Sequence, residues 1–523
     1  MGVFNKVGAY RILLGEAYFT LAGGGNAHGT DSVSGYHTRM RRSMILLACL
    51  VAAWGAPVVL AEGLPDLGEV SQTDFSPQVE KKVGESIMQD IRQKEPSYLD
   101  DPEVTGYLNR LGHRLASNSE GARMEFEFFA LRDPTLNAFA LPGGFIGVHT
   151  GLILATQSES ELASVLAHEI SHVTQHHIAR GVSQQSQSYA TTLLSLAVAI
   201  LAARTANGGD AAAGALVAGQ AAGVQQQLAY SRDFEREADR VGIQVLERSG
   251  FDVRGMGTFF QRLQRSSRLY ENNAPAYLQT HPLTTERIAD MENRIQAMPY
   301  HQVADSLDFQ LVRAKLRSEE GTPEDAVADF ESQIKERKFS SEAAARYGLA
   351  RALMRKQNYA AAEAQVGELR RLKVSSSMIE TLAADLRMKQ GDAAGAARLL
   401  RSAAALYPQE RAVAYALVES LLAAKQPQEA LKVTIADLQA YTTDYRMHGL
   451  QAETYAALGK RLEQHRAQGE SYALQGMLMP AIEQFELAQK APDGDFYEHS
   501  QVDARLRALK RQQADEAKQK KQP

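Results

Sequence analysis

Apolar and polar positions follow two different periods in the first part of the chain. Over residues 76–118 the apolar residues recur every three or four positions, which predicts helices. Alternation over 124–130 predicts a strand, and short apolar runs at 137–141 and 145–149 predict two more. The Pro-Gly-Gly sequence at 142–144 is typical of a turn. This region is therefore expected to combine helices with a small sheet.

Helical periodicity returns over residues 159–180 and 231–248, and Gly250 follows the second segment, as a C-terminal cap should. Between them, residues 190–224 form two apolar stretches rich in Ala and Gly. The apolar run at 193–203 has 11 residues, far fewer than the roughly 20 needed to span a bilayer. We expect this interval to contact a membrane surface peripherally; partner-contacting loops and burial in the core are the alternatives.

The second half of the chain carries an Ala-rich repeat. Alanines that each open an amphipathic helix recur every 34 residues, the tetratricopeptide period, at Ala362, Ala396 and Ala430. A small or apolar residue stands twelve positions before each, at Ala350, Ala384 and Val418. An earlier copy lies at Ala314 and Ala326, and a later one, offset as though one helix were inserted, at Ala481. Residues 306–493 are therefore expected to form a curved stack of helix pairs; an irregular helical bundle is the alternative.

Composition narrows the choices without naming a function. The 523 residues are 44% hydrophobic and 23% charged, so most of the chain should fold, in about three domains. A net charge of −5 argues against a nucleic-acid-binding protein. Cys49 is the only cysteine, which excludes an internal disulfide and a thiolate metal site. Any metal ion must therefore be held by His, Asp or Glu.

Residues 40–61 have the pattern of a secretory signal peptide, with two arginines, an apolar stretch and Ala61 at the cleavage position. We therefore expect export; an uncleaved anchor or lipidation at Cys49 is the alternative. Residues 1–39 lack a hydrophobic pattern. Because a signal peptide opens a chain, Met40 is the expected start and the preceding residues are interpreted as a mis-assigned extension.

The helix predicted over 159–180 contains an HExxH sequence, His168-Glu169-Ile-Ser-His172. A spacing of four puts both imidazoles on one helix face, where they can share a tetrahedral ion. Glu169 can then reach a metal-bound water as a general base. The alternative is a surface helix on which these side chains are merely solvated.

The helix predicted over 231–248 offers a third ligand, because Glu235 and Asp239 share one of its faces. Glu235 would complete a His-His-Glu site with an open fourth position, the arrangement of catalytic zinc. Asp239 suits a hydrogen bond to the free N–H of a ligand histidine. An ordinary charged helix face is the alternative, and it is the interpretation we favour for Asp233 and Glu237.

The predicted strand-turn-strand unit that ends at His149 immediately precedes the HExxH helix, so an edge strand is expected beside the metal. Extended peptides bind such edges by adding a strand to the sheet. The expected substrate is therefore a polypeptide segment and not a small molecule.

Four motifs occur in the order found in one family. They are the HExxH sequence, Asn137–Gly144, Ser231–Asp239, and Thr280-His-Pro-Leu283 followed by Glu286-Arg-Ile288. Together they resemble the zinc metallopeptidases that include HtpX and the CAAX prenyl endopeptidases. With the signal peptide and the repeats, the chain is similar to the periplasmic BepA type of this family over residues 65–495.

This resemblance implies one Zn²⁺ per chain, bound by His168, His172 and Glu235. It also implies that Glu169 is the catalytic acid/base and that Asp239 forms a hydrogen bond to a ligand histidine without binding the metal itself. These assignments agree with those made above from the residues themselves.

The resemblance further implies that His281, in the His-Pro motif, can occupy the open position of the metal as a plug and fourth ligand. Activity would then be latent until substrate or a partner moves the loop. Arg287 and His281 are the candidates for stabilising the transition state. His176 and His177 follow the zinc motif. We expect both on the surface; a role as alternative metal ligands is the other interpretation.

The expected fold is mainly α, with an α+β zincin-like metallopeptidase domain containing a small sheet, followed by an α-solenoid of tetratricopeptide repeats. The expected divisions are the extension at 1–39, the signal peptide at 40–61, the metallopeptidase at 62–300, the repeats at 301–495 and a charged tail at 496–523.

The leading hypothesis is an exported zinc endopeptidase, and chaperone, that acts on misassembled envelope proteins through attack of a metal-activated water. The resemblance implies outer-membrane β-barrel proteins as clients, the barrel-assembly machinery as partner, and a periplasmic location with peripheral contact to the outer membrane. A non-proteolytic repeat scaffold or chaperone with a structural or latent metal site is the alternative. No nucleic-acid partner is expected.

Overall fold

The computed structural model describes residues 76–120, 124–184, 232–269 and 276–519. The predicted extension, the signal peptide and Cys49 lie outside these residues, as does the apolar interval at 190–224. Within the described part of the chain, no helix is long and apolar enough to cross a membrane.

Two amphipathic helices open the described chain, α2 (Pro77–Lys94) and α3 (Pro102–Ala116). Each begins with a proline at its first position, and each has a capping side chain, Ser76 for α2 and Asp101 for α3. Their apolar faces are buried, with Leu108 of α3 fully inaccessible. Helices were predicted for this region, and the structure confirms them.

A three-stranded sheet follows, with β1 (Glu127–Leu131), β2 (Ala138–Ala140) and β3 (Phe145–His149) in the order β1-β3-β2. β1 runs parallel to β3 and β2 antiparallel to it. The turn η2 (Pro142–Gly144) connects β2 to β3 with Gly144 at a φ of 89°. A Cβ there would lie 2.2 Å from the carbonyl oxygen of Glu125, so only glycine fits. All three predicted strands are confirmed.

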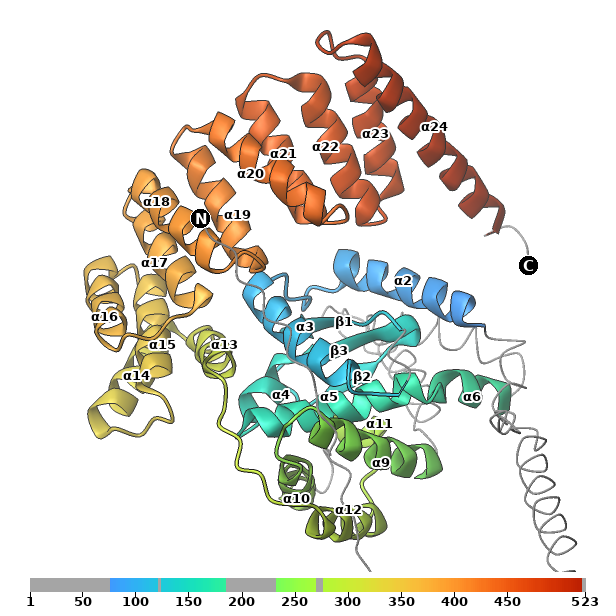
Figure 1. The fold of residues 1–523 in the computed structure, drawn as a ribbon, viewed down its shortest axis with the longest axis vertical. Coiled ribbons are helices and arrows are strands. Elements are labelled where there is room, and N and C mark those ends of the chain that lie inside the picture. Colours follow the sequence, from blue (N-terminus) through green and yellow to red (C-terminus); the bar gives the residue numbers. More distant parts are fainter. Residues whose placement is uncertain (1–75, 121–123, 185–231, 270–275, 520–523) are drawn as a thin grey trace, which may run out of the picture. The chain divides into compact units, whose positions relative to one another are not determined.

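Helix α4 (Thr150–Ala155) leads to α5 (Glu159–Thr174), which is capped by Ser158 and buried along its whole length. It packs against α3, the edge strand β2 and the following helices (Figure 1). The prediction of one helix over 159–180 is wrong about where that helix ends, because α5 stops at Thr174. The chain turns at His176, whose φ of 53° is left-handed, and a separate helix α6 (His177–Gln184) begins.

Four more helices complete this half, namely α9 (Arg232–Arg248), α10 (Arg254–Leu269), α11 (Ala276–Thr280) and α12 (Thr285–Ala297). Helix α9 ends at Arg248, and the predicted capping residue Gly250 follows with a φ of 73°. α9 lies close against α5 because Gly242 faces the backbone of His168; a Cβ on Gly242 would be 3.3 Å from the Cα of His168.

Helix pairs form the rest of the chain and confirm the predicted repeats (Figure 1). Their bounds are α13 (Leu307–Ser318), α14 (Pro323–Glu336), α15 (Glu342–Arg355), α16 (Tyr359–Arg371), α17 (Ser377–Lys389), α18 (Ala393–Leu406), α19 (Arg411–Ala423), α20 (Pro427–Ala440), α21 (Tyr445–Ala457), α22 (Arg461–Leu474), α23 (Leu478–Gln489) and α24 (Phe496–Gln519). The alanines at 362, 396 and 430 are each fully buried near the start of α16, α18 and α20.

The segment at 496–523 was predicted to be a charged tail that forms the end of a helix, and residues 496–519 are the helix α24. Its Val502, Leu506 and Leu509 are buried in one apolar cluster with residues of α22 and α23. The repeat stack therefore continues beyond residue 495, because three apolar side chains on one face of α24 supply a packing surface despite its many charges.

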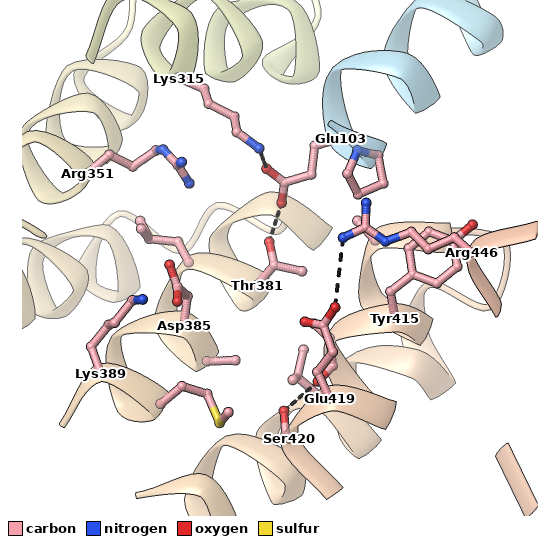
Figure 2. A pocket seen from close by; sticks show the side chains of 17 residues that line it. Glu103, Lys315, Arg351, Thr381, Asp385, Lys389, Tyr415, Glu419, Ser420 and Arg446 are labelled. Carbon is pink, nitrogen blue, oxygen red and sulfur yellow. Dashed lines mark hydrogen bonds and ion pairs between the residues drawn. The ribbon is translucent and has the colours of Figure 1, made fainter. Parts of the chain in front are cut away.

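An ion cluster joins α3 to the repeats (Figure 2). The ammonium of Lys315, on α13, lies 2.5 Å from a carboxylate oxygen of Asp101 and 2.6 Å from one of Glu103. The hydroxyl of Thr381, on α17, donates to the other oxygen of Glu103. Glu103, Lys315 and Thr381 border a cavity of about 440 Å³, which Arg351 also lines. The first repeat helices are thus tied to α3 by buried charge.

The tight approach of α9 to α5 predicts that Gly242→Val will destabilise the protein by about 1–3 kcal/mol, because the added methyl groups must push two helix backbones apart. Gly367→Val is the matched control, since Gly367 also lies inside a helix but has nothing within 4 Å of its Cβ position. Thermal unfolding of both variants checks this. Equal melting temperatures for the two variants would contradict it.

Candidate metal centre

Helix α5 brings the two histidines of the HExxH sequence together as the spacing predicts. His168 and His172 are both buried, and their Nε2 atoms lie 3.0 Å apart. Neighbouring turns of one helix place side chains four residues apart in this way. The α5 contribution to the site therefore follows directly from local sequence.

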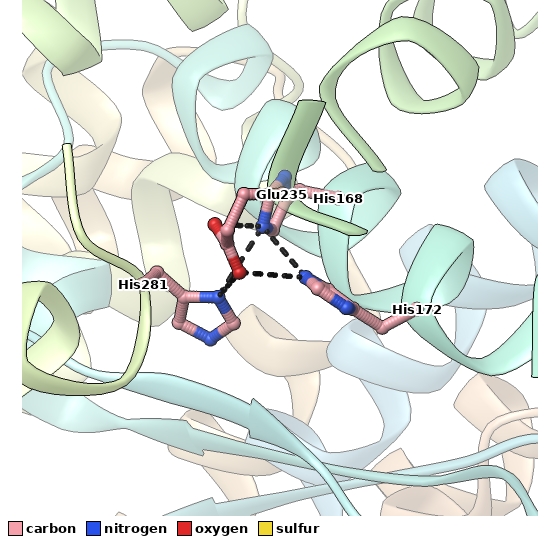
Figure 3. Close-up of side chains that lie close together, drawn as sticks. All are labelled: His168, His172, Glu235 and His281. Carbon is pink, nitrogen blue, oxygen red and sulfur yellow. Dashed lines mark hydrogen bonds and ion pairs between the residues drawn. The ribbon is translucent and has the colours of Figure 1, made fainter. Parts of the chain in front are cut away.

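Two residues from other elements complete the cluster (Figure 3). Glu235, in the first turn of α9, has carboxylate oxygens 3.5 Å from Nε2 of His168 and 3.4 Å from Nε2 of His172. His281, just after α11, places Nδ1 2.9 Å from Glu235 Oε1. Each of the four residues offers one ligand atom, and these atoms lie within 4.8 Å of one another. The cluster thus joins three separate segments of the chain.

This donor set fits a divalent cation. Three imidazoles and one carboxylate, all buried, match the nitrogen and oxygen ligands of zinc sites. Although burial opposes protonation of His168, its hydrogen bonds to Asp239 and Glu235 raise its pKa to about 10. The carboxylates thus favour a positive charge at this point, and a bound cation would supply it.

Glu169 follows the first histidine and faces the same cluster. Its side chain is fully buried, and neither carboxylate oxygen has a hydrogen-bond partner among the described residues. Nε2 of His281 lies 3.5 Å from Oε1 of Glu169. Burial raises the pKa of Glu169, against the opposing effects of His281 and His168. A carboxylate in this setting is suited to accept a proton.

Asp239 lies one turn after Glu235 on α9, where the sequence predicted a supporting carboxylate. Its Oδ1 is 3.0 Å from Nδ1 of His168. Arg287 donates two hydrogen bonds to it, from Nε at 2.7 Å and from Nη2 at 2.8 Å. Burial raises the pKa of Asp239, but the hydrogen bonds from Arg287 and His168 outweigh burial and lower it.

The guanidinium of Arg287 also contacts Glu235 and the backbone next to His281. Its Nη1 donates to the carbonyl oxygen of Pro282 at 2.7 Å and lies 2.7 Å from Glu235 Oε2. Arg287 thus connects the segment next to His281 with both acids of α9. Its predicted part in stabilising the transition state stays a prediction.

The His281 imidazole is held by α11. Its backbone N–H donates to the carbonyl oxygen of Tyr277 at 2.8 Å, and its ring stacks on the Tyr277 ring at a centroid distance of 4.6 Å. Tyr277 is buried, and no motif in the sequence indicated its place beside the site. The one sequence feature that could have indicated it is the spacing, because Tyr277 stands four positions before the candidate ligand His281, and residues four apart on a helix lie side by side.

The predicted surface position holds for His176, whose side chain is 42% exposed, but is wrong for His177, which is fully buried. Nδ1 of His177 lies 2.9 Å from Nδ1 of His172. A continuous helix would turn residue 177 well away from residue 172, because five residues correspond to about 140° of rotation. The left-handed turn at His176 brings the two rings together.

Comparison with known proteins agrees with this geometry. Residues 102–295 match Peptidase family M48, and residues 387–454 match a tetratricopeptide repeat. The beta-barrel assembly-enhancing protease of Yersinia pestis is 33% identical over 450 residues, which are 86% of this chain and 92% of the relative. That of Escherichia coli is 33% identical over 476 residues, 90% of this chain and 96% of the relative.

More distant similarity covers less of the chain. The mitochondrial metalloendopeptidase OMA1 of Schizosaccharomyces pombe is 29% identical over 224 residues, 42% of this chain and 62% of the relative. The bacterial relatives, by contrast, match nearly end to end. The chain therefore belongs to peptidase family M48, as a metalloendopeptidase with tetratricopeptide repeats and full-length similarity to beta-barrel assembly-enhancing proteases.

Proposed function

We propose that the protein is a zinc-dependent endopeptidase that cleaves misassembled polypeptides, with His168, His172 and Glu235 as metal ligands. The observation that carries this proposal is the buried cluster itself, in which three nitrogen or oxygen donors from α5 and α9 converge beside the unpartnered carboxylate of Glu169. A buried carboxylate without a hydrogen-bond partner is costly, and a proton-accepting role explains why it is kept.

The chain's own residues carry the proton and hold the ligands. When bound, the ion supplies Lewis-acid activation of a water molecule and of the scissile carbonyl. Glu169 accepts the proton of the attacking water and delivers it to the leaving amine. Asp239 accepts the Nδ1 proton of His168 and so keeps the Nε2 atom of that ring directed at the cluster.

Edge strand β2 is the proposed binding place for an extended substrate. It pairs with β3 on one side, and no other described strand pairs with it. It also packs against α5, the helix that carries Glu169. A polypeptide added alongside β2 would form main-chain hydrogen bonds and lie next to the catalytic carboxylate. This favours unfolded or misassembled chains as substrates.

We further propose that the repeats recruit these clients. Stacked helix pairs form extended surfaces suited to polypeptide partners. Because its full-length relatives are named beta-barrel assembly-enhancing proteases, outer-membrane barrel proteins and the barrel-assembly machinery are the proposed client and partner, with an assisting role as a chaperone. These proposed partners, and the signal peptide inferred from the sequence, support the periplasm as the proposed site of action.

His281 is the proposed plug of this site. It is 2.9 Å from Glu235 and 3.4 Å from His168, close enough to be a fourth ligand. A histidine in that position would compete with the attacking water, so the enzyme would be latent until the segment after α11 moves. A permanently bound His281 would instead favour the rival function, a repeat scaffold with a structural metal site.

Glu169→Gln is expected to reduce proteolysis by at least about 100-fold, because the amide cannot accept the proton, while zinc content stays at the wild-type level. Casein digestion and metal analysis of both purified proteins measure the two effects. Equal zinc content with no proteolysis in either protein would support the scaffold. Loss of zinc in the variant would assign Glu169 to metal binding instead.

His281→Ala is expected to raise proteolysis about 10-fold, which corresponds to a plug that stabilises the closed site by about 1.4 kcal/mol. His301→Ala is the matched control, since His301 is an exposed histidine outside the cluster. The rate of cleavage of an unfolded substrate is the measurement. A purified His281→Ala protein with wild-type or lower turnover counts against the plug.

A further inference from the structure

Behind His172, on the side away from the cluster, stands a second hydrogen-bonded system. Figure 3 shows one ring nitrogen of His172 turned to the cluster and the other turned away. The nitrogen turned away, Nδ1, lies 2.9 Å from Nδ1 of His177. Nε2 of His177 in turn lies 3.1 Å from a carboxylate oxygen of Glu237. A chain of two imidazoles thus ends on a carboxylate.

The protons in this chain can be assigned from chemistry. A neutral His172 that gives its Nε2 lone pair to a cation carries its proton on Nδ1. His177 must then accept with Nδ1 and carry its own proton on Nε2, from which it donates to Glu237. Each contact in this arrangement pairs one donor with one acceptor. The whole chain is therefore consistent with a single tautomer of each ring.

Packing fixes the position of the intermediate ring. The His177 imidazole is fully buried and stacks on the ring of Phe234, with centroids 4.6 Å apart and an interplanar angle of 9°. Arg180 covers the same phenyl ring at 4.6 Å and donates from Nη1 to Glu237 at 2.9 Å. Phe234 of α9 and Arg180 of α6 therefore hold the intermediate ring and the terminal carboxylate of this hydrogen-bonded chain in place.

We propose that His177 and Glu237 are positioning residues that fix the tautomer and the orientation of the metal ligand His172. This inference rests on the proposed metal site. The Nδ1 atoms of the two proposed ligand histidines then have different neighbours. Nδ1 of His168 lies 3.0 Å from the buried carboxylate of Asp239, whereas Nδ1 of His172 is connected to Glu237 through the ring of His177. Glu237 has a side chain that is 35% exposed, so water screens its charge more than that of Asp239.

Zinc affinity of the full-length protein, measured by competition with a chromophoric chelator, tests this. His177→Phe keeps an aromatic ring against Phe234 but removes the acceptor, and it is expected to weaken zinc binding about 10- to 100-fold. His177→Asn restores an acceptor oxygen near the Nδ1 position and is expected to recover most of that loss. His176→Asn, at the adjacent exposed histidine, is the matched control and should bind like wild type.

Two results would overturn the proposal while leaving the metal site intact. One is wild-type zinc affinity in a folded His177→Phe protein. The other is equal loss in His177→Phe and His177→Asn, which would assign the residue to packing alone. A wild-type protein that binds no zinc would refute the proposed metal site itself, which is a different outcome.

Glu237 gives an independent test if the buried substitution prevents folding. Glu237→Ala is expected to weaken zinc binding about 3- to 10-fold, less than the loss of His177, because Glu237 acts one step further from the ligand. Asp233→Ala is the matched control, since Asp233 is an acid of the same helix with an 82% exposed side chain. Equal zinc affinity of these two variants would overturn the role of Glu237.

Discussion

The close contact between α9 and α5 is the constraint on which the site depends. α9 can approach because Gly242 presents only hydrogen to the backbone of His168. That approach lets three acids of α9 reach imidazoles on α5 and α6, with Glu235 at both ligand histidines, Asp239 behind His168 and Glu237 behind His177. Helix α9 therefore supplies the acids beside His168, His172 and His177, whereas Glu169 of α5 lies beside His281.

Charge balance follows from this packing. Glu169, Glu235 and Asp239 are all buried, and the effective cost of an isolated buried charge is several kcal/mol. Arg287 offsets part of this cost through its contacts with Asp239 and Glu235. A divalent cation would offset the rest. The groups proposed to carry out hydrolysis are therefore also buried charges that a cation would neutralise, which links the proposed metal binding to local stability.

Prediction from the sequence succeeded for features that depend on the spacing of residues along the chain. Three such features were predicted from the sequence and are present in the structure. They are the four-residue separation of His168 and His172, the 34-residue repeat and the Pro-Gly-Gly turn. It failed for His177, because the left-handed turn at His176 leaves no periodic signal. His281 was expected at the site only through family resemblance, since its approach depends on tertiary packing of α11.

The Lys315 cluster has a consequence for how this architecture can change over evolution. Lys315 neutralises two acids of α3, and Phe309 from the same helix packs against Tyr107 of α3 with ring centroids 6.4 Å apart. Apolar residues of both halves form one continuous core. The boundary drawn near residue 300 is therefore not a place where gene fusion could exchange one repeat array for another. A replacement repeat array would need a cationic and an aromatic side chain in place of Lys315 and Phe309, or would have to retain α13.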